Sequence, residues 1–276
     1  MRIALIYIIL ILSLSTSSAQ EGLDKLMNIA DSVYASGNYF DAITEYKRVQ
    51  FFDTSGKYSF KTNLQIANCY KKGMKLSHAK KYFAEALQFA NGKDEIFKVE
   101  IELVKSKILE RNFNSAKEQI RRMEKKYFSV EKKNELKYWM GWNFMFAGEW
   151  KAAADIFNEI GEEQLAQICK ETNEKEYDVQ TAKLLSYFIP GAGQFYTGEY
   201  LSGLMSLAWN AVWGYVTINA FTAERIFDGI VVGNLLWFRF YRGNFQNAEK
   251  FAVEKNIEIY NNAYKYLNEK YKGKKP

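Results

Sequence analysis

The sequence predicts an all-α protein in which consecutive helix pairs are followed by a hairpin of apolar helices. Three observations lead to this prediction. Only two prolines occur in 276 residues, and helix-forming Lys, Glu, Ala and Leu are abundant. Similar residues recur every 37 positions in the first part of the chain. A long uncharged stretch follows in the second part.

Residues 1–19 have the three parts of a secretory signal peptide. Arg2 is followed by an apolar run at residues 3–14, interrupted by Ser13, and small residues lead to Ala19. We expect cleavage after Ala19. The alternative is an uncleaved anchor, for which the apolar run is short. No cysteine lies near the cleavage position, which disfavours a lipid-anchored protein.

Composition points away from several classes of site. The formal net charge of +6 is spread along the chain, as on a solvated surface, so no nucleic-acid partner is expected. Cys69 and Cys169 are predicted to be buried free thiols, although export would permit a disulfide. The sole histidine, His78, rules out a multi-histidine metal site, and no phosphate loop is present. We expect no enzyme activity, catalytic residues, cofactor or metal.

Between residues 22 and 162 the chain contains four similar units. Alanines separated by 37 residues mark equivalent positions: Ala42, Ala79, Ala116 and Ala153. Large residues three positions earlier mark the start of a second helix in each unit: Tyr39, Leu76, Phe113 and Trp150. The small alanine would let paired helices approach closely. A unit of this size cannot bury its own apolar face, so the units are expected to stack.

These units resemble tetratricopeptide repeats. That family has a small residue at its eighth position and Gly-x-Tyr before its second helix; the matching residues are Ala30, Ala67, Gly141, Gly37–Asn38–Tyr39 and Gly148–Glu149–Trp150. The third unit departs from the pattern at Val104 and Arg111, so local distortion is expected there. The resemblance implies a helical solenoid whose concave face binds a protein or peptide partner.

Candidate partner-binding residues lie on the first helices, from which contacts at the concave face of such arrays usually come. They are Asn63, Asn68 and Lys71. The alternative is a structural spacer without a ligand, because a fold does not by itself imply a function.

Residues 163–182 are predicted to form a linker helix and residues 183–242 a membrane domain. Between Glu199 and Glu224 lie 24 uncharged residues, enough to cross the hydrocarbon layer as a helix. Residues 226–241 would return and complete a transmembrane hairpin. Residues 184–198 are shorter and contain Pro190, so an interfacial helix and turn is expected.

Small and polar residues in this region suggest how its helices pack. Pro190, Gly191 and Gly193 would form a turn, and Gly229 with Gly233 would permit close helix approach. Residues spaced four apart form one small or polar stripe on the predicted span: Ser202, Ser206, Asn210 and Gly214.

The polar exceptions in the apolar stretch are few. Asn210 is predicted to bond with Asn234. Asp228 and Arg239 are either functional or interfacial, with the interfacial interpretation favoured.

Residues 180–256, with IPGAGQFY and RFYRGNFQNA, resemble bacterial two-transmembrane-helix domains of uncharacterised role. The resemblance supplies no catalytic residues. Residues 243–276 are predicted to form an amphipathic basic tail, which could lie on anionic lipid headgroups. The side of the membrane on which this tail emerges is left open.

These features together predict a scaffold of the bacterial cell envelope. Its exported, periplasmic repeat domain would bind partner proteins, and its hairpin would contact membrane lipid. The alternative is a membrane-active component whose hairpin oligomerises or contacts lipid or substrate, with regulatory repeats. The oligomeric state is left open.

Overall fold

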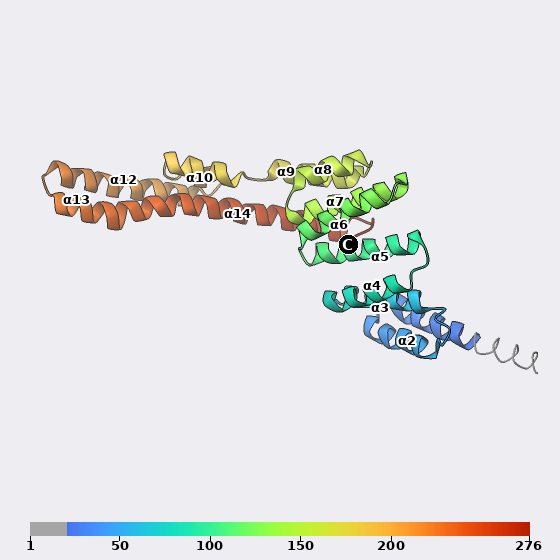
Figure 1. Cartoon of the computed structure of the whole chain (residues 1–276). Coiled ribbons are helices and arrows are strands. Elements are labelled where there is room, and N and C mark those ends of the chain that lie inside the picture. The colour runs from blue at the N-terminus through green and yellow to red at the C-terminus, as the bar shows by residue number, and fades with distance from the viewer. Residues whose placement is uncertain (1–20) are drawn as a thin grey trace, which may run out of the picture. The chain divides into compact units, whose positions relative to one another are not determined.

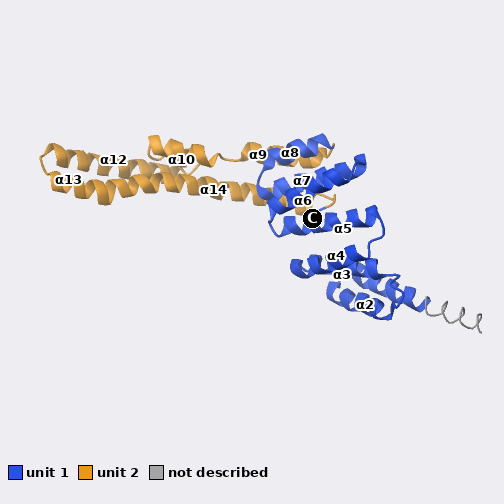
Figure 2. Ribbon diagram, viewed as in Figure 1, with its two compact units in different colours: residues 1–160, 275–276 blue, residues 161–274 orange. Residues whose placement is uncertain are grey.

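The computed structural model describes residues 21–276, so the predicted signal peptide at residues 1–19 lies outside this range. Across residues 21–276 the chain forms helices and turns, without strands. The predicted all-α fold class is therefore confirmed. The chain divides into two compact units, shown in Figure 2. Unit 1 ends at Ile160 and includes residues 275–276, and unit 2 comprises residues 161–274.

Unit 1 contains four helix pairs. The first helices are residues 21–35, α3 (Ser59–Lys72), α5 (Lys93–Leu109) and α7 (Val130–Ala147). The second helices are α2 (Tyr39–Phe52), α4 (Leu76–Gln88), α6 (Phe113–Lys126) and α8 (Trp150–Glu159). From α2 to α8 each helix packs on the next, and α5 also packs on α7 (Figure 1). Unit 1 is thus a helical-repeat arrangement, compatible with a tetratricopeptide-like fold.

One turn geometry connects the helices of all four pairs. Each second helix begins at the aromatic or leucine residue at which the 37-residue period predicts it. Two positions earlier, one residue has a left-handed backbone, with φ of +84° at Gly37, +56° at Met74, +59° at Arg111 and +82° at Gly148. The distortion expected in the third unit is absent at this turn, because Arg111 adopts the conformation that glycine adopts in the first and fourth units.

Small residues bring the paired helices together. The four alanines of the repeat, at positions 42, 79, 116 and 153, are fully buried. Trp150 is also buried, whereas Tyr39, Leu76 and Phe113 are half-buried. A Cβ at Gly141 would lie 2.6 Å from the ring of Phe157, so the close contact of α7 with α8 requires glycine at that position.

Unit 2 begins with α9 (Glu163–Lys175) and α10 (Val179–Phe188). The predicted linker helix at 163–182 is interrupted at residues 176–178. The Asp178 side chain accepts a hydrogen bond from the Thr181 N–H and so caps α10. After a turn at residues 189–191, the short α11 (Ala192–Tyr196) leads into α12 (Tyr200–Thr222).

A helical hairpin forms the rest of unit 2. α12 packs on a return arm made of α13 (Ile226–Val232), the π-helical turn η1 (Gly233–Trp237) and α14 (Phe238–Glu269). These three elements follow one another without an intervening loop, so one arm includes both the predicted second span and most of the predicted tail.

The predicted transmembrane character of this hairpin is not supported. Within residues 21–276, no helix combines the length and the apolar content needed to cross a membrane. α12 is uncharged, but polar and small residues such as Ser206, Asn210 and Asn219 interrupt its apolar sequence. The return arm carries Asp228 and Arg239.

Replacing Arg111 by glycine should stabilise unit 1. A left-handed backbone is strained for arginine but not for glycine, so R111G should raise the free energy of unfolding by roughly 0.5–1 kcal/mol. Arg121→Gly, in the interior of α6, should lower it by about 1 kcal/mol because glycine is a poor helix former. Urea unfolding followed by circular dichroism measures both. Destabilisation by R111G would contradict the left-handed turn.

Candidate functional site

Asn244 of α14 lies at the centre of a buried polar cluster in unit 2. Its Oδ1 accepts hydrogen bonds from the Gly191 N–H and the Ser206 hydroxyl, each at 2.8 Å. Its Nδ2 donates to the backbone carbonyl of Ser186 at 2.5 Å. Gln194 Nε2 donates to the backbone carbonyl of Asn244 at 2.9 Å and to its Oδ1 at 3.2 Å. We call Ser186, Gln194, Ser206 and Asn244 the Asn244 cluster.

The remaining bonds of the cluster close it. The Ser186 hydroxyl donates to Gln194 Oε1 at 2.8 Å and accepts from the Gly193 N–H at 2.9 Å. Ser186, Gln194 and Asn244 are buried. Because the cluster contains no ionisable group and its members bond to one another, it suits the positioning of α10, α11, α12 and α14 rather than proton transfer.

The predicted turn residues are part of this packing. Pro190 precedes Gly191, which has φ of +92° and lies against the backbone of Gly203. A Cβ at Gly193 would lie 2.7 Å from the Cβ of Ala248. The Pro-Gly-Ala-Gly sequence therefore provides a turn together with two close helix approaches.

The other predicted glycines lie between the two arms of the hairpin. A Cβ at Gly229 would be 3.0 Å from the Phe221 ring, and one at Gly233 would be 3.2 Å from Thr217 Cγ2. The predicted bond between Asn210 and Asn234 is wrong. Asn210 Nδ2 donates to the carbonyl of Ser206 at 2.8 Å, and Asn234 Nδ2 donates to that of Ile230 at 3.1 Å, each within its own helix.

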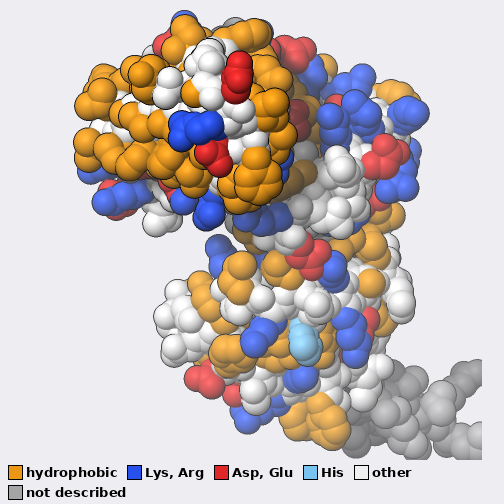
Figure 3. Space-filling model, turned by 90° about the vertical axis from the view of Figure 1, so that its left-hand side faces the viewer, with side chains coloured by type: hydrophobic (Ala, Val, Ile, Leu, Met, Phe, Trp, Pro, Cys, Tyr) orange, Lys and Arg blue, Asp and Glu red, His pale blue; other side chains and the backbone are white. Residues whose placement is uncertain are grey.

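The outward surface of the hairpin is apolar. On α12 the exposed large hydrophobic residues are Tyr200, Leu201, Leu204, Met205, Leu207, Trp209, Val212, Tyr215, Ile218 and Phe221. At 3.6 residues per turn they cover roughly two thirds of the circumference of the helix. On the return arm the exposed ones up to the start of α14 are Ile226, Phe227, Ile230, Leu235 and Phe238, and further along α14 they are Val253, Ile257 and Tyr266. Figure 3 views the end where α12 meets α13, with hydrophobic side chains around a few charged groups.

The predicted partner-binding residues of unit 1 make contacts within the array. Asn63 is buried; its Oδ1 accepts from Gln50 Nε2 at 2.9 Å and its Nδ2 donates to the Ser59 carbonyl at 2.8 Å. Asn68 is half-buried and donates to Gln65 Oε1 at 3.0 Å. Of the three candidates, Asn68 is the one that offers surface to a partner.

Lys71 belongs to a largely buried ion cluster that links first helices. Glu102 of α5 pairs with Lys71 of α3 and with Lys105, both at 2.6 Å. Lys105 Nζ also lies 4.4 Å from the ring centroid of Trp139 on α7. Burial alone would raise the pKa of Glu102, but the two ammonium groups outweigh burial and hold that pKa below its ordinary value. Burial lowers the pKa of Lys105, and the attraction of Glu102 and Glu135 does not offset this effect fully.

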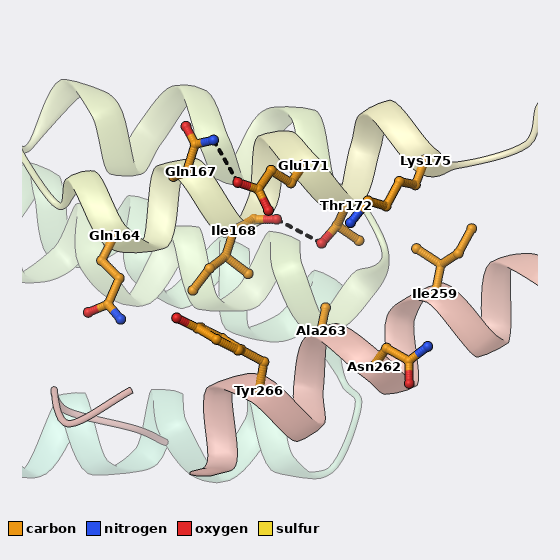
Figure 4. A pocket seen from close by; sticks show the side chains of 10 residues that line it. All are labelled: Gln164, Gln167, Ile168, Glu171, Thr172, Lys175, Ile259, Asn262, Ala263 and Tyr266. Atoms are coloured by element: carbon orange, nitrogen blue, oxygen red, sulfur yellow. Dashed lines mark hydrogen bonds between the residues drawn. The ribbon is translucent and has the colours of Figure 1, made fainter. Parts of the chain in front are cut away.

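A groove of about 440 Å³ lies between α9 and α14, within unit 2 (Figure 4). Ile168, Ile259 and Ala263 give it an apolar lining, and Tyr266 reaches towards Ile168. Polar and charged residues complete it: Gln164, Gln167, Glu171, Thr172, Lys175 and Asn262. This groove had no signal in the sequence, because its two walls are more than 80 residues apart.

The cysteines are free and buried, as predicted. Burial raises the pKa of Cys69 and of Cys169 to about 12, so both thiols are protonated at neutral pH. In the described part of the chain, no three His, Cys, Asp or Glu side chains gather as a metal site would require.

Comparison with known proteins does not assign the chain to a family. No family model matches it, and no curated protein or solved structure is significantly similar to it. The site must therefore be interpreted from its own geometry.

Substituting Asn244 by alanine should loosen unit 2. The variant leaves the Gly191 N–H and the Ser206 hydroxyl without their acceptor and the Ser186 carbonyl without its donor, at a cost of about 2–4 kcal/mol. Amide hydrogen exchange should show lost protection at Gly191. Asn262→Ala, at an exposed position on the same helix, should leave protection unchanged. Equal protection in N244A and wild type would contradict the structural role of the cluster.

Proposed function

We propose that the protein is a membrane-attached scaffold of the bacterial cell envelope, in which a tetratricopeptide-like array binds partner proteins and the hairpin of unit 2 contacts lipid. The observation that carries the proposal is the apolar outer surface of the hairpin. Signal-peptide-like residues 1–19 support export, which would place the array in the periplasm.

The pattern of exposure favours lipid over a single protein partner. A surface helix docked on one partner has one apolar stripe and a polar face opposite. In α12 the polar stripe instead faces the return arm, where Ser206 bonds to Asn244 and Gly214 lies beside Trp237. The remaining outer surface carries large hydrophobic residues such as Leu201 and Tyr215. An apolar solvent on all outer sides accounts for this inverted distribution.

The scaffold role is supported by unit 1. Helical-repeat arrays use extended surfaces formed by successive units to bind other proteins. Ion pairs between first helices, such as Lys61 with Asp31 at 2.7 Å and Lys71 with Glu102, connect neighbouring units. These contacts favour a firm platform on which partially exposed side chains such as Asn68 remain accessible.

Membrane attachment is tested by flotation of the full chain with phosphatidylcholine vesicles. The wild type should float with the vesicles. The double variant Leu201→Glu with Phe227→Glu places two charges on the apolar surface and should bind about a hundredfold more weakly.

The matched control for flotation is Phe51→Glu with Phe128→Glu, which changes two equally exposed side chains of unit 1. It should float like the wild type. If both double variants bind as the wild type does, or if the wild type stays unbound, membrane attachment through the hairpin is wrong.

The scaffold role is tested by photocrosslinking in the native envelope. A photoreactive residue at position 68, on α3, should form a defined adduct with another protein. The same residue at Lys81, an exposed position on α4, should not. Equal labelling from both positions, or labelling from position 81 alone, would contradict a partner surface on the first helices.

A further inference from the structure

The hairpin contains a groove between α12 and α14 that the Asn244 cluster does not fill. Its volume is about 340 Å³, and it adjoins a second groove of about 380 Å³. Arg239 and Gly243 line both, so the two grooves meet at these residues. We call this space the Arg239 groove.

One buried polar atom in the wall of this groove has no partner. Asn210 is 5% exposed and lines the groove, and its Nδ2 is used by the Ser206 carbonyl. Its Oδ1 is buried without a hydrogen-bond donor. A buried acceptor left unpaired costs about 1–3 kcal/mol, so its presence calls for a ligand that donates a hydrogen bond.

The groove is also positively charged. Arg239 and Arg242 line it, and no carboxylate does. Within residues 21–276 neither arginine forms an ion pair. The guanidinium group matches the geometry of a phosphate through paired N–H donors. A ligand that suits this groove therefore carries a phosphate together with a hydroxyl group.

The surroundings place the groove at a boundary between apolar and charged surface. From Gly229 to Phe238 the return arm has no charged residue, and Arg239 ends that run. The rings of Trp209 and Phe240 stack at 5.6 Å beside the groove. Aromatic rings and arginine at the end of an apolar run are typical of the headgroup level of a membrane.

We infer that the Arg239 groove binds the headgroup of a phosphatidylglycerol-type lipid. The arginines contact the phosphate, and Asn210 Oδ1 accepts a hydrogen bond from the glycerol hydroxyl. A headgroup that carries an ammonium group, as in phosphatidylethanolamine, fits less well because two guanidinium groups lie nearby. This inference rests on the proposed membrane attachment. A soluble phosphate ester such as glycerol 3-phosphate offers the same phosphate and hydroxyl groups, but it would bind without a membrane.

The test compares binding of the full chain to vesicles of phosphatidylcholine alone and of phosphatidylcholine with phosphatidylglycerol. Arg239→Gln removes the guanidinium group, and Lys250→Gln removes one exposed charge from the same helix. Gly243→Leu fills the groove without a change of charge, and space is open there because a Cβ at Gly243 meets nothing within 4 Å.

With a specific site, phosphatidylglycerol should strengthen binding of the wild type. K250Q should bind the vesicles that contain phosphatidylglycerol about fivefold more weakly than the wild type does, as expected for the loss of any surface charge near anionic lipid. R239Q and G243L should each bind these vesicles at least about tenfold more weakly than the wild type. R239Q removes the guanidinium partner of the phosphate, and G243L fills the space that the headgroup would occupy. Retained binding of both variants to neutral vesicles would show that they are folded and attached.

Two results would overturn the inference while leaving membrane attachment intact. One is an equal loss in R239Q and K250Q with no loss in G243L, which is the signature of nonspecific attraction. The other is binding of glycerol 3-phosphate by titration calorimetry without vesicles, lost in R239Q, which would assign the groove to a soluble ester. Failure of the wild type to bind neutral vesicles would instead count against the proposed attachment.

Discussion

The side chain of Asn244 holds together the part of unit 2 from which the hairpin extends. Through it, α14 bonds to the carbonyl at the end of α10, to the N–H of Gly191 before α11 and to Ser206 on α12. An unpaired buried amide is costly, and any shift of α10, α11, α12 or α14 along its neighbours would break these bonds. The hydrogen bonds of Asn244 therefore fix the relative positions of these four helices. Gly191 and Gly193 make the register possible because any side chain there would separate the helices. The stacked Trp209, Trp213 and Phe240 then continue the contact along the hairpin.

In unit 1 a comparable constraint is carried by backbone conformation. The left-handed residue before each second helix fixes the direction in which that helix returns, and it recurs at intervals of 37 residues. Glycine supplies it without strain at positions 37 and 148, whereas Met74 and Arg111 adopt it at some cost. The repeat alanines are fully buried where the two helices of each pair meet, so a larger residue there would push the helices apart. The left-handed turn and this close helix contact together define the geometry of each repeat.

The sequence was most informative where structure depends on neighbours in the chain. The 37-residue period located the starts of α2, α4, α6 and α8, because a turn and its helix are local. It could not reveal the partner of Lys71, since Glu102 lies 31 residues away and is reached through tertiary packing. The role of Asn244 was missed because its partners are also distant in the sequence. In addition, an asparagine in an amphipathic helix looks like a surface residue. Counting uncharged residues also overestimated how well α12 could cross a membrane, because its polar stripe reduces its apolar content.

That stripe nevertheless determines how the hairpin meets its surroundings. Ser206 and Gly214 face the return arm and are used in packing, whereas most of the large hydrophobic residues of α12 turn outward. The same inversion leaves Asn210 Oδ1 buried beside Arg239, in a groove without a carboxylate. A hairpin made only for packing would gain from an apolar residue at position 210. The cost of an unpaired acceptor next to an unpaired cation is therefore best explained by a ligand that satisfies both.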